Sequence, residues 1–193
     1  MNRTTEKKWR LADLPLVALL LLGLSTGSGA QAPDALRRLK AELLASPSAT
    51  QTLTDYCTRL HLADPPAIRA LRDLGIDRKA DGRVRRLLQV GSAEPVRYRR
   101  VRLSCGDQVL SDADNWYVPA RLTAEMNSTL DGSDTPFGTV VKPLDFQRRT
   151  LGTAGLHDGR HVLRVTALLV NRDGLPFSLV QENYSAILVH HPQ

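Results

Sequence analysis

Hydrophobic positions recur at helical spacing in the first third of the chain and at strand spacing after it. Leucines three to four residues apart predict a helix at residues 34–45, and similar spacing predicts a second helix at 49–62. A third, short helix is predicted at 66–74, closed by Gly75. We therefore expect the front of the domain to be helical.

Alternating apolar and polar positions dominate from residue 83 onward. The clearest pair of strands is 96–105 and 109–118, joined by the turn Gly106-Asp107. In the first strand, one face carries Val96, Tyr98, Arg100 and Arg102, and the other carries Arg97, Arg99, Val101, Leu103 and Cys105. Further strands are predicted at 83–90, 146–151, 161–170 and 177–189.

Two helical segments interrupt the series of strands. One is predicted at 122–130, and the other is a helical turn that starts at Asp134 or Thr135 and runs to about Val141. These segments are suited to act as a lid over a sheet. The fold class predicted is α+β: a single antiparallel sheet of about six strands with helices on one side.

The first 32 residues have the pattern of a signal peptide. A basic segment is followed by an apolar run at 14–24 and by small residues that end in Ala30-Gln31-Ala32. The apolar run is short against the ~20 residues of a membrane-spanning helix. We therefore predict a cleaved signal peptide at 1–32, a single α+β domain at 33–193, and a periplasmic or secreted product without a stable membrane span.

Net charge and amino-acid composition limit the classes of binding partner that we expect. The predicted signal peptide carries four positive and two negative residues, so the net charge falls from +6 to about +4 on cleavage. Aromatic residues make up only 5% of the chain, which leaves few stacking platforms for single-stranded nucleic acid. Ligand spacings for zinc are absent from the sequence, and we expect no metal, no cofactor and no nucleic-acid partner.

Two cysteines, Cys57 and Cys105, leave two alternatives open. In an oxidising compartment the pair can form a disulfide. Alternatively, both are buried free thiols packed as small apolar side chains. The sequence gives no distance between them and does not decide.

Three residues could carry the chemistry of a ligand site. Arg100 lies mid-strand, and its planar guanidinium suits a carboxylate, although it could equally face solvent. Glu182, in an apolar strand, could be an ion-pair partner, an acid–base group or an outward side chain. Phe137 stands where backbone N–H groups begin a helical turn, which is either an anion contact or a plain helix start.

Four motifs, in order and at similar spacing, resemble those of the chorismate lyase family. They are Arg100-Val101-Arg102-Leu103-Ser104-Cys105-Gly106-Asp107, Trp116-Tyr117-Val118-Pro119, Asp134-Thr135-Pro136-Phe137-Gly138 and the last strand with Glu182. The resemblance covers roughly residues 96–188. It implies an antiparallel sheet with helices on one side and a ligand held beneath two lids, a fold shared with ligand-sensing domains of transcription regulators.

The resemblance also implies roles for individual residues. Arg100 falls on the arginine that binds the ligand carboxylate, and Phe137 falls on a residue that offers a backbone contact. Glu182 falls on the catalytic glutamate, and Ala49 falls near a lid contact from the helical region. We therefore expect Arg100 and Glu182 to point into one enclosed cavity, with Phe137 at its rim.

Two functions are favoured over a third, a polyanion-binding surface protein, which rests on the arginines alone. The resemblance implies an enzyme that converts chorismate to 4-hydroxybenzoate and pyruvate by elimination, in which aromatisation provides the driving force. The alternative is a non-catalytic periplasmic module that binds a small aromatic or cyclic carboxylate. In either case we expect a monomer with a small carboxylated ligand.

Overall fold

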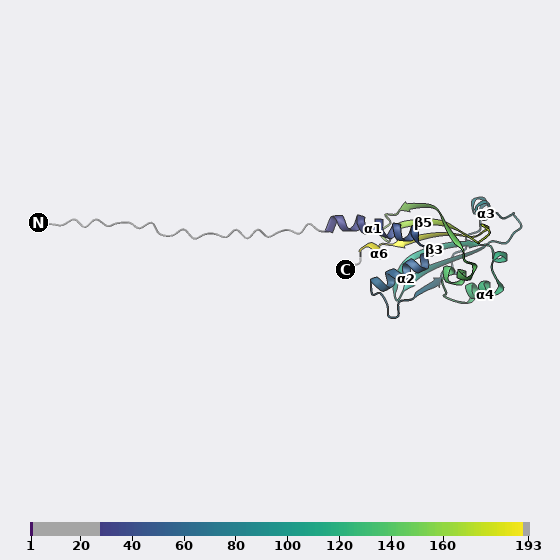
Figure 1. The fold of residues 1–193 in the computed structure, drawn as a ribbon, viewed down its shortest axis with the longest axis horizontal. Coiled ribbons are helices and arrows are strands. Elements are labelled where there is room, and N and C mark those ends of the chain that lie inside the picture. The colour runs from purple at the N-terminus through teal and green to yellow at the C-terminus, as the bar shows by residue number, and fades with distance from the viewer. Residues whose placement is uncertain (2–27, 191–193) are drawn as a thin grey trace.

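Six antiparallel strands form one sheet, in the order β1-β2-β3-β6-β5-β4, in the computed structural model of the chain (Figure 1). The structure describes Met1 and residues 28–190, with side chains of the second range from residue 33. The strands are Ile68–Arg72 (β1), Arg97–Cys105 (β2), Gln108–Tyr117 (β3), Gln147–Gly155 (β4), His161–Val170 (β5) and Pro176–Ser185 (β6). The predicted α+β class, with one antiparallel sheet of six strands, is confirmed.

Along the chain, helices precede the first strand and also lie between later strands. The α-helices are Ser28–Ala45 (α1), Ala49–Arg59 (α2), Gly82–Leu88 (α3), Ala124–Gly132 (α4), Phe137–Val140 (α5) and Ile187–His190 (α6). Short 3-10 helices lie at Pro119–Arg121 and Lys142–Leu144. In Figure 1, α1 and α6 lie together at one end of the sheet, whereas α3 and α4 lie at the other end.

The sheet is made mostly of strands that follow one another in the chain. The predicted hairpin is β2–β3, and it turns at Gly106, whose φ of +53° is a conformation that glycine adopts freely. The pairing of β3 with β6 is different, since it joins distant segments and places Ala113 opposite Glu182. This pairing brings the front and back halves of the domain together.

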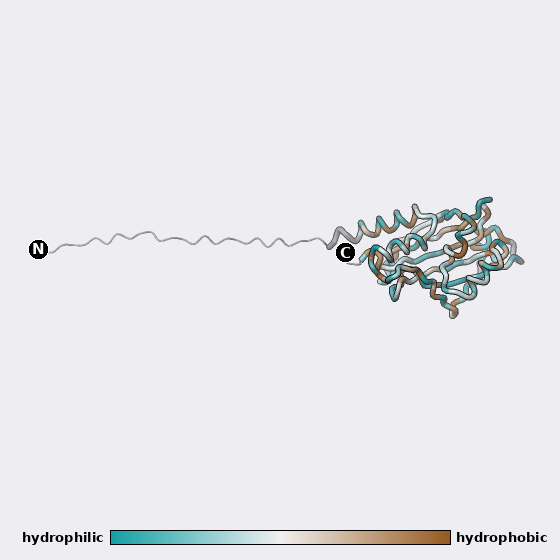
Figure 2. Tube along the Cα trace, turned by 60° about the horizontal axis from the view of Figure 1, so that its bottom comes forward, coloured by the Kyte–Doolittle hydropathy of each residue, from teal (hydrophilic) through white to brown (hydrophobic). Residues whose placement is uncertain are grey.

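Most helices cover one face of the sheet. The apolar sides of α1 and α2 pack on that face through Leu39, Leu43 and Leu53, and α4 and α5 pack further along it through Leu130 and Phe137. Figure 2 shows apolar and polar segments alternating along α1, as this packing requires. The other face is partly covered by α3, which packs Val84 and Leu88 against it.

Two predicted elements were wrong in type. The predicted helix at 66–74 contains the edge strand β1, in which Ala70 is buried and lies opposite Leu103 of β2. The predicted strand at 83–90 is the helix α3, which Asp81 caps by accepting a hydrogen bond from the backbone N–H of Val84 at 2.8 Å. For β1, pairing with β2 overrides the local preference for a helix. For α3, the cap favours a helix over the predicted strand.

The chain ends differ from prediction in extent. α1 begins at Ser28 rather than at residue 34, and β6 stops at Ser185, after which α6 follows where a continuous strand was predicted. The predicted signal peptide at 1–32 falls mainly on residues 2–27, which lie outside the described residues. Within the described part of the chain, the helices are too short or too polar to cross a membrane.

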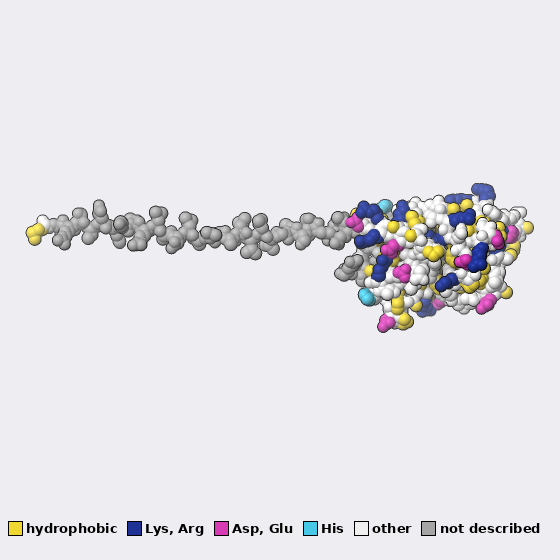
Figure 3. All heavy atoms as spheres, in the orientation of Figure 1, with side chains coloured by type: hydrophobic (Ala, Val, Ile, Leu, Met, Phe, Trp, Pro, Cys, Tyr) yellow, Lys and Arg dark blue, Asp and Glu magenta, His cyan; other side chains and the backbone are white. Residues whose placement is uncertain are grey.

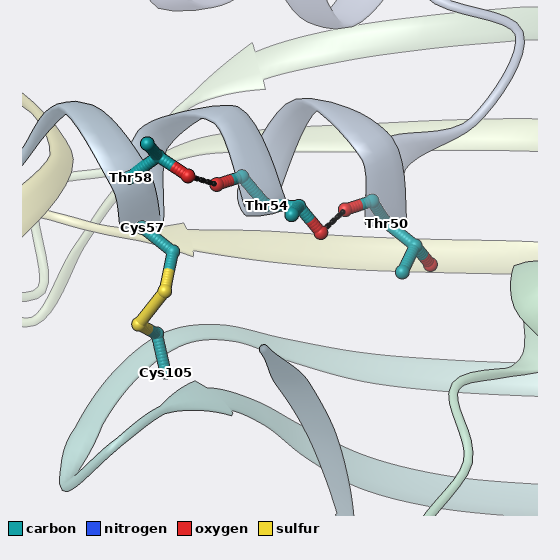
Figure 4. Close-up of a disulfide and its surroundings, with 5 residues drawn as sticks. All are labelled: Thr50, Thr54, Cys57, Thr58 and Cys105. Carbon is teal, nitrogen blue, oxygen red and sulfur yellow. Dashed lines mark hydrogen bonds between the residues drawn. A yellow bond between two sulfur atoms is a disulfide. The ribbon is translucent and has the colours of Figure 1, made fainter. Parts of the chain in front are cut away.

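The two cysteines form a disulfide, which decides between the alternatives left open by the sequence. Cys57 of α2 and Cys105 at the end of β2 are both buried, and their Cα atoms are 5.9 Å apart. Figure 4 shows that the bond ties one end of α2 to the strand beneath it. On another side of the same helix, the hydroxyls of Thr54 and Thr58 donate to the backbone carbonyls one turn earlier, each at 3.0 Å.

Charged side chains of both signs are intermingled on the surface. On the face drawn in Figure 3, basic groups alternate with acidic ones instead of forming one continuous basic surface. Several of the exposed arginines are paired, for example Arg59 with Glu42 and Arg97 with Asp131, both at 2.7 Å. This face therefore lacks the uninterrupted basic patch of a polyanion-binding protein.

Candidate functional site

A pocket lies between the covered face of the sheet and the segments that lead into α2 and α5. Its cavity volume is about 50 Å³, within about 530 Å³ of space between atoms that includes the open solvent at its mouth. Its walls are mainly apolar and are formed by Val101, Leu103, Ala113, Phe137, Phe146, Leu169 and Val180. Three charged side chains, Arg99, Arg148 and Glu182, also line it. Apolar walls with few polar groups are typical of small-molecule sites.

The mouth of the pocket lies where two chain segments meet. Ser48 and Thr50 come from the start of α2, and Gly138 comes from α5. A side-chain carbon built on Gly138 would lie 3.1 Å from both hydroxyl oxygens, which is tighter than most such contacts. Glycine at 138 thus lets the two segments approach closely over the pocket. The Ser48 side chain makes no capping bond to α2, so its hydroxyl is not engaged by the helix end.

Glu182 is held in a buried ion pair on the floor of the pocket. A terminal nitrogen of Arg148 lies 2.6 Å from Glu182 Oε2, and the Tyr184 hydroxyl donates to the same oxygen at 2.8 Å. Burial lowers the pKa of Arg148, but the charge and hydrogen bond of Glu182, together with Tyr184, outweigh it and raise that pKa. Burial and the charge of Glu182 also raise the pKa of Tyr184, which keeps it a neutral donor. The two hydrogen bonds therefore hold the Glu182 carboxylate in one orientation.

Arg99 is the second buried cation of the pocket, and it lacks an acidic partner. Only 5% of the residue is exposed, and among the described residues its Nε and Nη1 atoms have no hydrogen-bond partner. Its Nη2 atom reaches only the backbone carbonyls of Ser133 and Thr135, at 3.4 and 3.3 Å. Burial, with the neighbouring charge of Arg72, lowers the pKa of Arg99 to about 10. The side chain is still charged near neutral pH and is poorly compensated.

Asn115 adds a further donor beside Arg99. The two residues lie directly opposite each other on β2 and β3, and both line the pocket. Asn115 Oδ1 accepts a hydrogen bond from the Ser178 hydroxyl at 2.5 Å, whereas its buried Nδ2 has no partner within the described residues. Arg99 and Asn115 thus both line the pocket, and both carry buried donors for which an anion could supply the acceptor.

The prediction that Arg100 and Glu182 share one cavity is wrong. Successive side chains of a strand point to opposite faces, and the pocket face of β2 carries Arg99 and Val101. Arg100 points to the other face, where its Nη1 lies 2.8 Å from Asp114 Oδ1. Asp114 is only 2% exposed and also contacts Arg78 and the Tyr98 hydroxyl. Arg100 therefore belongs to a buried ion-pair network on the opposite side of the sheet.

The other residues named from the resemblance line the pocket. Glu182, Phe137 and Ala49 all line the pocket, Ala49 as the first residue of α2. The Phe137 ring packs between Tyr117 and Phe177, with ring centroids 5.5 and 6.4 Å away. Their contacts with a ligand remain predictions.

Sequence reasoning missed three polar residues of the pocket. Arg99 was placed on the apolar side of its strand, next to Val101 and Leu103, and that position was the signal that could have identified it. Arg148 and Asn115 gave no such signal. Within the described residues, no group of three acidic, histidine or cysteine side chains is arranged to hold a metal ion.

Solved structures with a similar fold are parts of transcription regulators. PhnF from Mycobacterium smegmatis aligns with a TM-score of 0.53 and 12% identity over 74% of this chain and 65% of its own. A GntR-family transcriptional regulator from Enterococcus faecalis V583 aligns with a TM-score of 0.46 and 13% identity over 66% of this chain and 99% of its own. Other similar structures include effector and ligand-binding domains of such regulators. The likeness to PhnF shows the fold alone, which is the chorismate-lyase-like fold.

Sequence comparison finds a much nearer relative. No protein-family model matches the chain. The uncharacterized protein y4mC of Sinorhizobium fredii (strain NBRC 101917 / NGR234) is 40% identical over 188 residues, which cover 86% of this chain and 79% of the relative. Identity at this level over most of both chains shows common descent and a common fold. The chain belongs to the family of the uncharacterized protein y4mC.

Proposed function

We propose that the domain binds a small aromatic or cyclic carboxylate in the pocket between the sheet and the α2 and α5 segments. The observation that carries this proposal is Arg99, a buried guanidinium that lines the pocket and has unpartnered N–H groups. A buried charge without a partner is costly, and a ligand carboxylate would supply the missing counter-charge. Small-molecule binding also agrees with the effector and ligand-binding domains of similar fold.

The apolar walls support a ring as the body of the ligand. Phe137 and Phe146 stand on the lid side, and Val101, Leu169 and Val180 line the sheet side. A flat ring would lose water on both faces between these walls, and its carboxylate would lie at the Arg99 end. Asn115 Nδ2 offers a further donor to the same carboxylate.

A second proposal is that the pocket converts chorismate to 4-hydroxybenzoate and pyruvate. It is favoured by Glu182, which lines the same pocket as Arg99 and is oriented by Arg148 and Tyr184. Both bonds fall on Oε2, so Oε1 is not hydrogen-bonded within the described residues and could take part in proton transfer. The reaction breaks the enolpyruvyl ether bond, removes a ring proton and leaves an aromatic ring.

We further propose that the domain works outside the cytoplasm as a monomer. The signal-peptide pattern at residues 1–32 supports export. The Cys57–Cys105 disulfide adds support, because such bonds persist in oxidising compartments.

Binding is tested by calorimetry with benzoate, 4-hydroxybenzoate and chorismate on the wild type and on two variants. Arg99→Met should weaken carboxylate binding at least about 10-fold, because it removes charged donors worth roughly 1.5–3 kcal/mol. Arg100→Met is the matched control from the adjacent position on the other face, and its affinity should stay within about 3-fold of wild type. Loss of binding in the Arg100 variant alone, or no binding of any carboxylate by the wild type, would refute the proposal.

Turnover is tested separately by incubating the protein with chorismate and measuring 4-hydroxybenzoate by chromatography. An enzyme should give product at a rate proportional to protein concentration, and Glu182→Gln should abolish it. If the wild type binds carboxylates but forms no product above the spontaneous rate, the domain is a binding module.

A further inference from the structure

The charges around the pocket do not balance in the absence of a ligand. Arg148 and Glu182 neutralise each other at 2.6 Å, with side chains only 3% and 9% exposed. Arg99 is left as a single uncompensated cation. Two acidic residues of the neighbouring segment, Asp131 and Asp134, are already paired with Arg97 and Arg69 at 2.7 and 2.6 Å. The pocket therefore carries a net charge of one positive unit.

We propose that Glu182 sets the charge of the ligand that the pocket accepts. By acting as an internal counter-ion to Arg148, it leaves a site that matches a ligand with one carboxylate and rejects a ligand with two. Glu182 is thus a specificity-determining residue for monocarboxylates. The inference rests on the proposed function, because it presumes that Arg99 binds a ligand carboxylate.

The selectivity follows from the burial of the pair. A second carboxylate on the ring would be buried beside the Glu182 carboxylate, and two like charges in a low-dielectric site repel each other. It could take Arg148 only by displacing Glu182, which would then be a buried charge without a partner. Neutral atoms at the same place on the ring meet neither penalty. Selection against a second charge is therefore built into the floor of the pocket.

This inference separates the two proposed functions. Chorismate carries two carboxylates, whereas 4-hydroxybenzoate carries one. A pocket with one net positive charge favours a monocarboxylate such as 4-hydroxybenzoate as its tightly bound ligand. It therefore supports the binding module over the enzyme.

Four proteins and two ligands test the proposal by calorimetry. Terephthalate and its monomethyl ester share one ring and nearly one size but differ by one negative charge. The proteins are the wild type and three variants. Glu182→Gln leaves the cation of Arg148, Arg148→Gln leaves the anion of Glu182, and the double variant leaves a neutral pair. Thermal unfolding monitors whether each variant is folded.

The expected result is a change in the ratio of the two affinities. The wild type should bind the monoester at least about 10-fold more tightly than terephthalate, and Glu182→Gln should shift this ratio at least about 10-fold toward terephthalate. Arg148→Gln should weaken binding of both ligands, and the double variant should return to the wild-type ratio. If a single variant does not fold, the double variant decides, because a preference for terephthalate there would contradict a charge-based mechanism.

Two failures are distinguishable. An affinity ratio that is the same in the wild type and in Glu182→Gln overturns the role of Glu182 but leaves carboxylate binding intact. If the wild type binds neither ligand, the proposed function fails and this inference fails with it.

Discussion

At the scale of single residues, the proposed ligand binding depends on which of two adjacent arginines faces the pocket. Arg99 and Arg100 have the same chemistry, but the period of two along β2 sends them to opposite faces. Arg100 meets the buried carboxylate of Asp114, whereas Arg99 meets apolar walls and two backbone carbonyls. The first arrangement satisfies a charge, and the second leaves one available to a ligand.

The stability of the ligand-free protein should distinguish the two positions. Arg99→Met should raise the free energy of unfolding by about 1–3 kcal/mol, because it removes a buried charge that lacks a partner. Arg100→Met should lower it by about 1–3 kcal/mol, because Asp114 loses one of its cationic partners. Urea unfolding without ligand measures both changes. A destabilised Arg99 variant would mean that its long contacts to Ser133 and Thr135 contribute more than its burial costs.

The candidate site was only partly predictable from the sequence. Glu182 of β6 and the first residues of two helices, Phe137 of α5 and Ala49 of α2, were named from the resemblance and line the pocket. The resemblance pointed to Arg100, whereas the adjacent Arg99 lines the pocket, because a shift of one residue on a strand reverses the face. The contacts of Arg148 depend on the β4–β5–β6 pairing, which brings it to Glu182 from 34 residues away. Local pattern carries no information about such a contact.

At the scale of elements, predictions succeeded where a segment was long and strictly periodic. The hairpin β2–β3 and the strand β5 match their predicted bounds closely. For two short elements the predicted type was wrong: β1 was predicted as a helix and α3 as a strand. Their five and seven residues are fewer than two helical turns, which is too short for the pattern to distinguish the two types. For β1, the deciding contact is the register with β2, which places Ala70 opposite Leu103.

The disulfide is the strongest link between the helical layer and the sheet. It connects residues 48 apart in sequence, for which the chain-entropy relation gives roughly 4 kcal/mol of stabilisation. We expect reduction of the disulfide to lower the urea midpoint of the wild type by an amount that corresponds to this stabilisation. The Cys57→Ala/Cys105→Ala variant is the control, and its midpoint should match that of the reduced wild type and not respond to reductant. Equal midpoints for oxidised and reduced wild type would show that the bond does not contribute to stability.

At the scale of the whole molecule, we predict that the protein is exported and that its signal peptide is cleaved. If residues 1–32 are a signal peptide, protein isolated from the native cell envelope should begin near Pro33 and have an intact mass that includes one disulfide. Intact-mass measurement before and after reduction checks both points. An uncleaved chain in the cytoplasm would contradict the proposal and would place the domain where the thiols stay reduced.

The pairing of β3 with β6 also has a consequence for the order in which the domain folds. The hairpin β2–β3 and the meander β4–β5–β6 each form between neighbouring segments, whereas β3–β6 must close a long loop and is expected to form late. Arg99 and Asn115 belong to the first unit, and Arg148 and Glu182 belong to the second. Neither unit contains a complete pocket, so a ribosome-bound chain cannot bind ligand until its last strand has emerged. A bound carboxylate would then span the junction between the two units, and unfolding that starts by parting β3 from β6 would first have to release it.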